Sequence, residues 1–113
     1  MDNLVIPHTD LIEAIIKEKL ADRAGIPNLT YQAIIDHESK NYLLIRTGWR
    51  ESKNYYLVIY HFQIAEDGKV WVHQDNTDSV IVDDLLNAGI PNDQIVLAFH
   101  APERRPDTNL KVD

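Results

Sequence analysis

The stretch from residue 55 to residue 74 constrains the fold more than any other part of this sequence. It reads YYLVIYHFQI, then AEDG, then KVWVHQ. Both apolar arms are rich in β-branched and aromatic residues, and Asp-Gly between two such arms is a strong signal for a β-hairpin. At about 3.3 Å per residue the first arm extends about 33 Å, which is long for a strand. We therefore expect this hairpin at the centre of a sheet on which the other elements pack.

Further strands are predicted on both sides of the hairpin. Residues 29–36 and 42–49 are apolar runs joined to each other and to the hairpin by short polar loops. Consecutive strands with short loops favour an antiparallel meander. Residues 94–99 form another short apolar run, which we expect at the sheet edge. The prediction for residues 1–113 is a single α+β domain with two layers: an antiparallel β-meander sheet of four to five strands, with two helices packed on it.

Two helices are predicted from their boundaries. The first begins at Thr9-Asp10 and ends at Gly25-Ile26-Pro27, and the second begins at Thr77-Asp78 and ends at Gly89-Ile90-Pro91. Hydroxyl and carboxylate side chains cap helix N-termini, and acidic residues there favour the positive end of the helix dipole. Glycine in the left-handed conformation, followed by an apolar residue and proline, ends helices.

The first helix carries a wide apolar stripe. It covers about half of the helix circumference at 100° per residue, which exceeds a single narrow core contact. One interpretation is a helix set deep in a groove of its own domain, which we favour. The other is that one edge of the stripe meets a partner chain. The stripe consists of Leu11, Ile12, Ile15, Ile16 and Leu20.

The loop of the central hairpin decides which side chains share a face. A two-residue turn places Ile64 opposite Trp71, whereas a three-residue loop at residues 66–68 places Ile64 opposite Val70. We favour the three-residue loop because it gives a uniformly apolar core face: Val58, Tyr60, Phe62, Ile64, Val70 and Val72. It also sets His61 opposite His73. The opposite face then holds His61, Gln63, Trp71, His73 and Asp75.

His61, His73 and Asp75 form a candidate metal site in this register. Two histidines and one carboxylate suit a non-haem metal, and a small metal-dependent enzyme is the alternative function that they suggest. The other interpretation is a pair of half-exposed histidines beside a helix-capping aspartate, with Asp75 or Thr77 as the cap. We favour the second interpretation, because these residues lack the close spacing of a known metal motif.

Composition narrows the function classes. The chain of 113 residues has a formal net charge of −7, no cysteine, and no basic run longer than Arg104-Arg105. Tight nucleic-acid binding needs a basic surface, so we expect no direct DNA binding. There is no phosphate-binding glycine loop and no nucleophile elbow. The sequence has neither a membrane-length apolar run nor a signal-peptide pattern, so we expect a cytoplasmic protein without membrane contact.

The C-terminal segment carries a candidate site for an acidic group. His100 and Pro102 precede Arg104-Arg105, which are locally distinctive in an acidic chain. Arginine side chains suit carboxylate and phosphate recognition. The other interpretation, weighted about equally, is a tail folded back on the domain.

Several separated motifs resemble the XisI family, the fdxN element excision controlling factors found mostly in cyanobacteria. The resemblance runs from the second predicted strand to the C-terminus. The loop that usually reads Asp-Gly-Thr-Glu is Asp75-Asn76-Thr77-Asp78 here, and Leu110 replaces an aromatic residue. The matching positions are Gly48, Trp49, His61, residues 68–72 with Trp71, Asp75, Thr77, residues 89–91, residues 95–102, Arg105 and Thr108.

The resemblance implies a non-enzymatic accessory factor for site-specific excision of a DNA element. It implies action through a XisH-like protein partner, with no catalytic residues and no cofactor to carry over. Whether the chain also forms a homo-oligomer is left open. The expected partner-binding residues are His100, Pro102, Arg104, Arg105 and Thr108.

Overall fold

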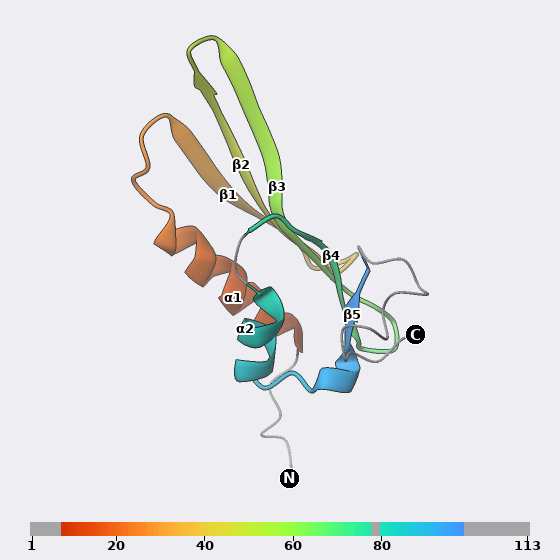
Figure 1. Ribbon diagram of the computed structural model, residues 1–113. Helices are drawn as coiled ribbons and strands as arrows, with labels where there is room; N and C mark the ends of the chain where they lie inside the picture. The colour runs from red at the N-terminus through yellow and green to blue at the C-terminus, as the bar shows by residue number, and fades with distance from the viewer. Residues whose placement is uncertain (1–7, 78–79, 99–113) are drawn as a thin grey trace.

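The computed structural model describes residues 8–77 and 80–98 and shows a two-layer α+β fold. A five-stranded sheet has the strand order β1-β2-β3-β4-β5, and both helices lie on one of its faces (Figure 1). The predicted fold class is therefore confirmed. The elements are α1 (His8–Asp22), β1 (Leu29–Asp36), β2 (Asn41–Arg50), β3 (Lys53–Ile64), β4 (Val70–Asp75), α2 (Ile81–Asn87), the short 3-10 helix η1 (Asn92–Gln94) and β5 (Ile95–Leu97).

The last strand departs from a purely antiparallel meander. Strands β1 to β4 pair antiparallel, as predicted, but β5 pairs parallel to β4. Helix α2 and η1 connect these two strands, so the chain returns to the edge in the same direction. The predicted edge position of residues 94–99 is confirmed for the described part of that run, 95–97.

The central hairpin has the predicted three-residue loop. Ile64 pairs with Val70, and Ala65 exchanges backbone hydrogen bonds with the far side of the loop, to Lys69 and from Gly68. Gly68 has φ 88°, the left-handed conformation that this loop requires and that glycine adopts without strain.

Two β-bulges change the alternation that a regular hairpin would have. The register shifts between Leu44 and Ile45, where Ile59 is the extra residue of β3, so Val58 pairs with Ile45 instead of lying on the core face. The prediction that Val58 belongs to the core face is wrong, and Leu57 packs against the core instead. A second shift between His61 and Phe62 sets His61 opposite Gln74 and not opposite His73.

The core lies between the sheet and the helices. Ile12, Ile15 and Ile16 of α1 are buried in it, and Leu11 and Leu20 pack against its edge. The whole apolar stripe of α1 is therefore used within the domain, which supports the groove interpretation. On the sheet side, Tyr60 and Phe62 stack with ring centroids 5.7 Å apart. Burying side chains of this kind contributes about 1.5–3 kcal/mol each.

Helix α2 ends as its sequence predicts. Gly89 has φ 106° and donates to the Leu86 carbonyl, while the Ile90 N–H donates to the Leu85 carbonyl at 3.1 Å. These two hydrogen bonds form a Schellman motif, in which the residue after the glycine contacts the last turn of the helix. Ile90 and Leu85 are both fully buried, so this ending also fastens α2 to the core.

Candidate functional site

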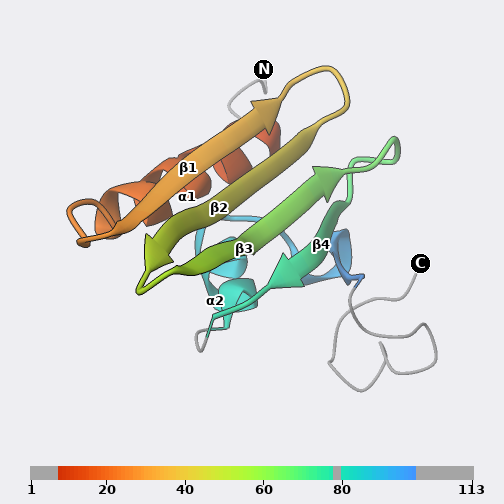
Figure 2. The ribbon, with the colours of Figure 1, turned by 90° about the horizontal axis from the view of Figure 1, so that it is seen from above.

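Within residues 8–77 and 80–98 both α-helices lie on one face of the sheet, and we call the other face the open face. Figure 2 looks onto this face, and both helices lie behind the strands. The pairing puts Ile34, Leu43 and His61 in one row across it, and Ile45 with Val58 in the next. Two groups of side chains occupy the open face. The apolar patch is Ile34, Leu43, Ile45, Tyr56 and Val58, and the histidine cluster is Asn41, His61, Gln63, Trp71 and His73.

The histidine cluster is held together by side-chain hydrogen bonds. His61 Nε2 donates to Asn41 Oδ1 at 2.8 Å, and His73 Nε2 donates to Gln63 Oε1 at 2.9 Å. An amide oxygen only accepts, so each ring carries its proton on Nε2. The two imidazole rings lie 4.8 Å apart, and the Trp71 ring lies 6.2 Å from His73. Although they are not paired in the ladder, the two histidines are in contact because His73 sits at the bulge.

Both histidines are disposed to be neutral. Partial burial lowers the pKa of His61, and the neighbouring His73 lowers it further. Partial burial also lowers the pKa of His73. Neutral rings also suit the amide oxygens of Asn41 and Gln63 that they bind, because these acceptors carry no net charge.

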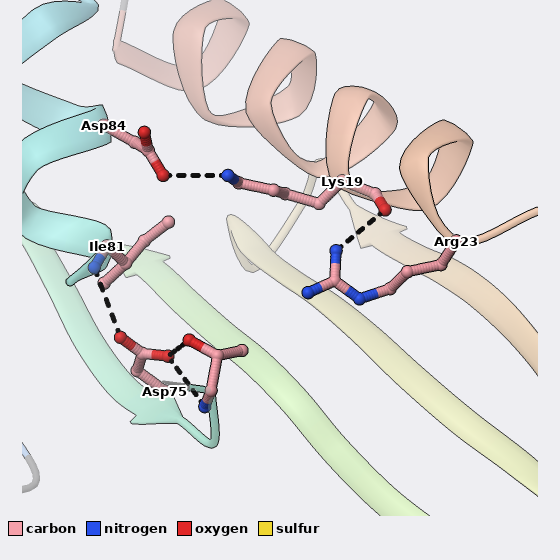
Figure 3. Close-up of polar contacts among 6 residues, drawn as sticks. Lys19, Arg23, Asp75, Ile81 and Asp84 are labelled. Atoms are coloured by element: carbon pink, nitrogen blue, oxygen red, sulfur yellow. Dashed lines mark hydrogen bonds and ion pairs between the residues drawn. The ribbon is translucent and has the colours of Figure 1, made fainter. Parts of the chain in front are cut away.

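Asp75 lies on the helix side of the sheet. The second bulge pairs it with Tyr60, a core residue, and the expectation that it shares a face with the histidines is wrong. Its Oδ1 accepts hydrogen bonds from the Thr77 hydroxyl at 2.7 Å and from the Thr77 N–H at 3.2 Å. Its Oδ2 accepts from the Ile81 N–H at 3.3 Å, as Figure 3 shows. Asp75 thus satisfies the first N–H of α2, which agrees with the capping interpretation.

The candidate metal ligands consequently do not converge. The carboxylate of Asp75 is directed to α2, whereas His61 and His73 lie on the open face. Within residues 8–77 and 80–98, no three His, Cys, Asp or Glu side chains are grouped so as to hold a metal ion. The arrangement of His61 and His73 is that of a hydrogen-bonded surface cluster.

Gly48 is required by close packing of two strands. A Cβ at this position would lie far inside contact distance of the Asn28 carbonyl oxygen, and 3.0 Å from Leu29 Cδ2. Trp49 follows it with 64% of its surface exposed. The indole lines a shallow hollow at the β2–β3 end of the sheet, together with Asn28, Arg50, Glu51, Lys53 and Tyr55. The two neighbouring motif positions therefore differ, since Gly48 has a packing role and Trp49 offers a surface.

The two helices are linked by an ion pair. Lys19 Nζ lies 2.9 Å from Asp84 Oδ2, and this hydrogen bond raises the pKa of Lys19 (Figure 3). Arg23 donates from Nη1 to the Lys19 carbonyl at 3.1 Å at the end of α1. Sequence reasoning missed the ion pair, because residues 65 positions apart give no periodic signal.

The remaining predicted residues lie outside the described part of the chain. These are His100, Pro102, Arg104, Arg105 and Thr108, the expected partner-binding residues. Neither described helix is long and apolar enough to cross a membrane.

These features define a small α+β protein whose described residues form one mixed sheet with both α-helices on the same face. The chain belongs to the XisI protein family, whose model matches residues 1–112. The resemblance seen in the motifs is thereby confirmed.

Solved structures with the same fold come from Anabaena variabilis ATCC 29413. The fdxN element excision controlling factor XisI of that organism is 34% identical, with a TM-score of 0.81. A XisI-like protein is 28% identical, with a TM-score of 0.87. Each comparison covers 94% of this chain and 96% of the other chain. No curated protein matches this chain.

Proposed function

We propose that this chain is a non-enzymatic factor that controls the excision of a DNA element. The observation that carries the proposal is membership of the XisI family over residues 1–112, together with 34% identity to a protein named as an fdxN element excision controlling factor. The match spans nearly the whole of both chains, so it concerns the complete domain and not one shared motif.

The chain acts in this role through a protein partner. Its net charge of −7 opposes tight contact with the phosphate backbone of DNA, where cationic side chains supply most of the affinity. An acidic protein instead suits a partner with a basic surface, because complementary charge speeds and orients association. The partner in this proposal is a XisH-like protein, and the DNA is cut and joined by separate proteins.

The partner contact is assigned to the C-terminal segment. The apolar stripe of α1, the other candidate surface, is engaged by the chain's own core. Arg104 and Arg105 are adjacent cations in an acidic chain, and their forked hydrogen-bond donors would bind carboxylates of the partner, while the acidic remainder of the chain would face the partner's basic surface. His100, Pro102 and Thr108 flank them.

Co-purification with a XisH-like protein, followed by light scattering, tests the partner. We expect one complex at low salt, weakened at high salt by screening. The Arg104→Glu/Arg105→Glu variant should lose the complex. The matched control Lys17→Glu/Lys53→Glu, which makes the same change in net charge at two exposed lysines, should retain it. Absence of a complex with the wild-type chain at low salt would contradict the partner.

An excision assay tests the role itself. Cells that lack this chain should accumulate the unexcised element, and the wild-type gene should restore the excised junction, measured by PCR across it. Equal excision with and without the gene would contradict a controlling role. Purified protein that cleaves the element's DNA without other proteins would show an enzyme instead.

A further inference from the structure

The apolar patch on the open face is not part of the core. Leu43 and Val58 are absent from the set of side chains that pack against the core, and Ile45, although only 5% exposed, is also outside the core cluster. At its borders Ile34 is 45% exposed and Tyr56 is 66% exposed. The strand register makes these five apolar side chains neighbours, with Ile45 buried at the centre, and neither described α-helix lies over this face of the sheet (Figure 2). Continuous patches of this kind mark interaction sites.

The open face carries almost no charge. Among the described strand residues that alternate onto it, Asp36 at one corner is the single charged side chain, and its carboxylate already accepts hydrogen bonds from Ser39 and Glu38. The chain as a whole is 26% charged residues. Depletion of charge together with aromatic and aliphatic side chains is the composition of the centre of a protein interface.

Charge also decides which partner fits. Two copies with a net charge of −7 repel each other over most of their surface, and the open face is where they can approach without placing carboxylates together. A basic partner that is recognised by its charge would gain no electrostatic binding energy on an uncharged face. Such a partner would bind the acidic surface elsewhere on the chain. The patch is thus suited to a second copy of this chain.

The area agrees with a dimer. Strands spaced about 4.8 Å apart, with a rise of about 3.3 Å per residue, give the five strands a flat area of roughly 600 Å², and corrugation by side chains increases it. A stable interface of standard size buries about 800 Å² per partner. The whole open face, including its corrugation, is needed to reach that size, so the contact would extend from the apolar patch into the histidine cluster.

We infer that the chain forms a two-fold symmetric homodimer through the open face. The two sheets pack face to face at about 10 Å, with the apolar patch of one copy on the apolar patch of the other. The same surface serves both subunits, as a two-fold interface requires. The dimer becomes a four-layer molecule, with helices outside and sheets inside.

Sedimentation velocity and light scattering between about 1 and 100 µM test the inference. The wild-type chain should have twice its mass of 13.0 kDa at the upper concentration. Tyr56→Lys and Ile34→Lys place a cation on the interface and should weaken the dimer at least ten-fold, at unchanged circular dichroism. The matched control is Leu86→Lys on α2, 39% exposed and outside the open face, which should leave the dimer intact.

Salt gives a second readout. Because the two copies repel each other and the contact is apolar, raising the salt concentration should strengthen the dimer, opposite to the charge-assisted complex proposed with the XisH-like protein. A wild-type chain that is monomeric at 100 µM would overturn the inference. So would a dimer that Leu86→Lys weakens as much as Tyr56→Lys does. If the wild-type chain is monomeric and Tyr56→Lys abolishes the complex with the XisH-like protein, the open face is the binding site for that partner instead.

Discussion

Replacing Gly48 by alanine tests the packing at the β1–β2 boundary. The new Cβ would overlap the Asn28 carbonyl oxygen, a backbone atom that cannot rotate away, and would touch Leu29 Cδ2 at 3.0 Å. Restoring an ordinary contact distance of about 3.5 Å to that oxygen requires a backbone displacement of about 1 Å. Such overpacking costs up to about 3 kcal/mol, and the reduced freedom of the unfolded chain offsets about 0.7 kcal/mol of it.

We therefore expect Gly48→Ala to lower the free energy of unfolding by about 2 kcal/mol. For a domain of this size, that lowers Tm by roughly 6–10 °C. Urea unfolding followed by far-ultraviolet circular dichroism measures it, at one fixed protein concentration, because an oligomer makes stability concentration-dependent.

Gly25→Ala is the control that separates steric overlap from backbone conformation. A Cβ at Gly25 meets nothing within 4 Å, but the residue has φ 84°. Its cost of about 1 kcal/mol arises from the left-handed conformation alone. If Gly48→Ala changed the free energy of unfolding by less than about 0.5 kcal/mol, or by less than Gly25→Ala, the steric reasoning would be refuted.

Three other perturbations follow from the polar contacts. Asp75→Ala removes the acceptor at the start of α2 and should lower the free energy of unfolding, measured with urea, by about 1–2 kcal/mol. Asp75→Asn should lose less, because its amide oxygen can still accept a hydrogen bond. Equal losses in the two variants would argue against the hydrogen bonds. A double-mutant cycle with Lys19→Met and Asp84→Asn should give a coupling of about 0.5 kcal/mol that disappears in high salt, because the pair is partly exposed; a salt-independent coupling would contradict a screened ion pair. The lowered pKa values of His61 and His73 mean that the unfolded chain binds protons more readily below its histidine pKa of about 6.5, so stability should decrease from pH 7.5 to pH 5.5. Chemical denaturation of His61→Gln/His73→Gln should show a flatter pH profile, and an unchanged slope would exclude the two histidines as its source.

The features that the sequence determined by itself are local ones. The alternation of apolar residues in the two arms predicted the three-residue hairpin loop, and Gly68 allows it because glycine adopts the left-handed conformation without strain. Gly89 followed by Ile90 specified the end of α2 for the same reason, through hydrogen bonds that span only six residues. The apolar stripe of α1 likewise predicted its buried face from helical periodicity.

The arrangement of the candidate site depended on the positions of two β-bulges, which the local sequence pattern does not specify. Each β-bulge adds one residue to one strand, and the choice between a regular and a bulged ladder depends on how both strands pack against the helices. The bulge at His73 moved Asp75 from the histidine face to the start of α2, and the bulge at Ile59 moved Val58 from the core to the open face. The register therefore follows from packing of the whole sheet and not from burial of single residues. This tertiary packing separated the candidate metal ligands and created the apolar patch.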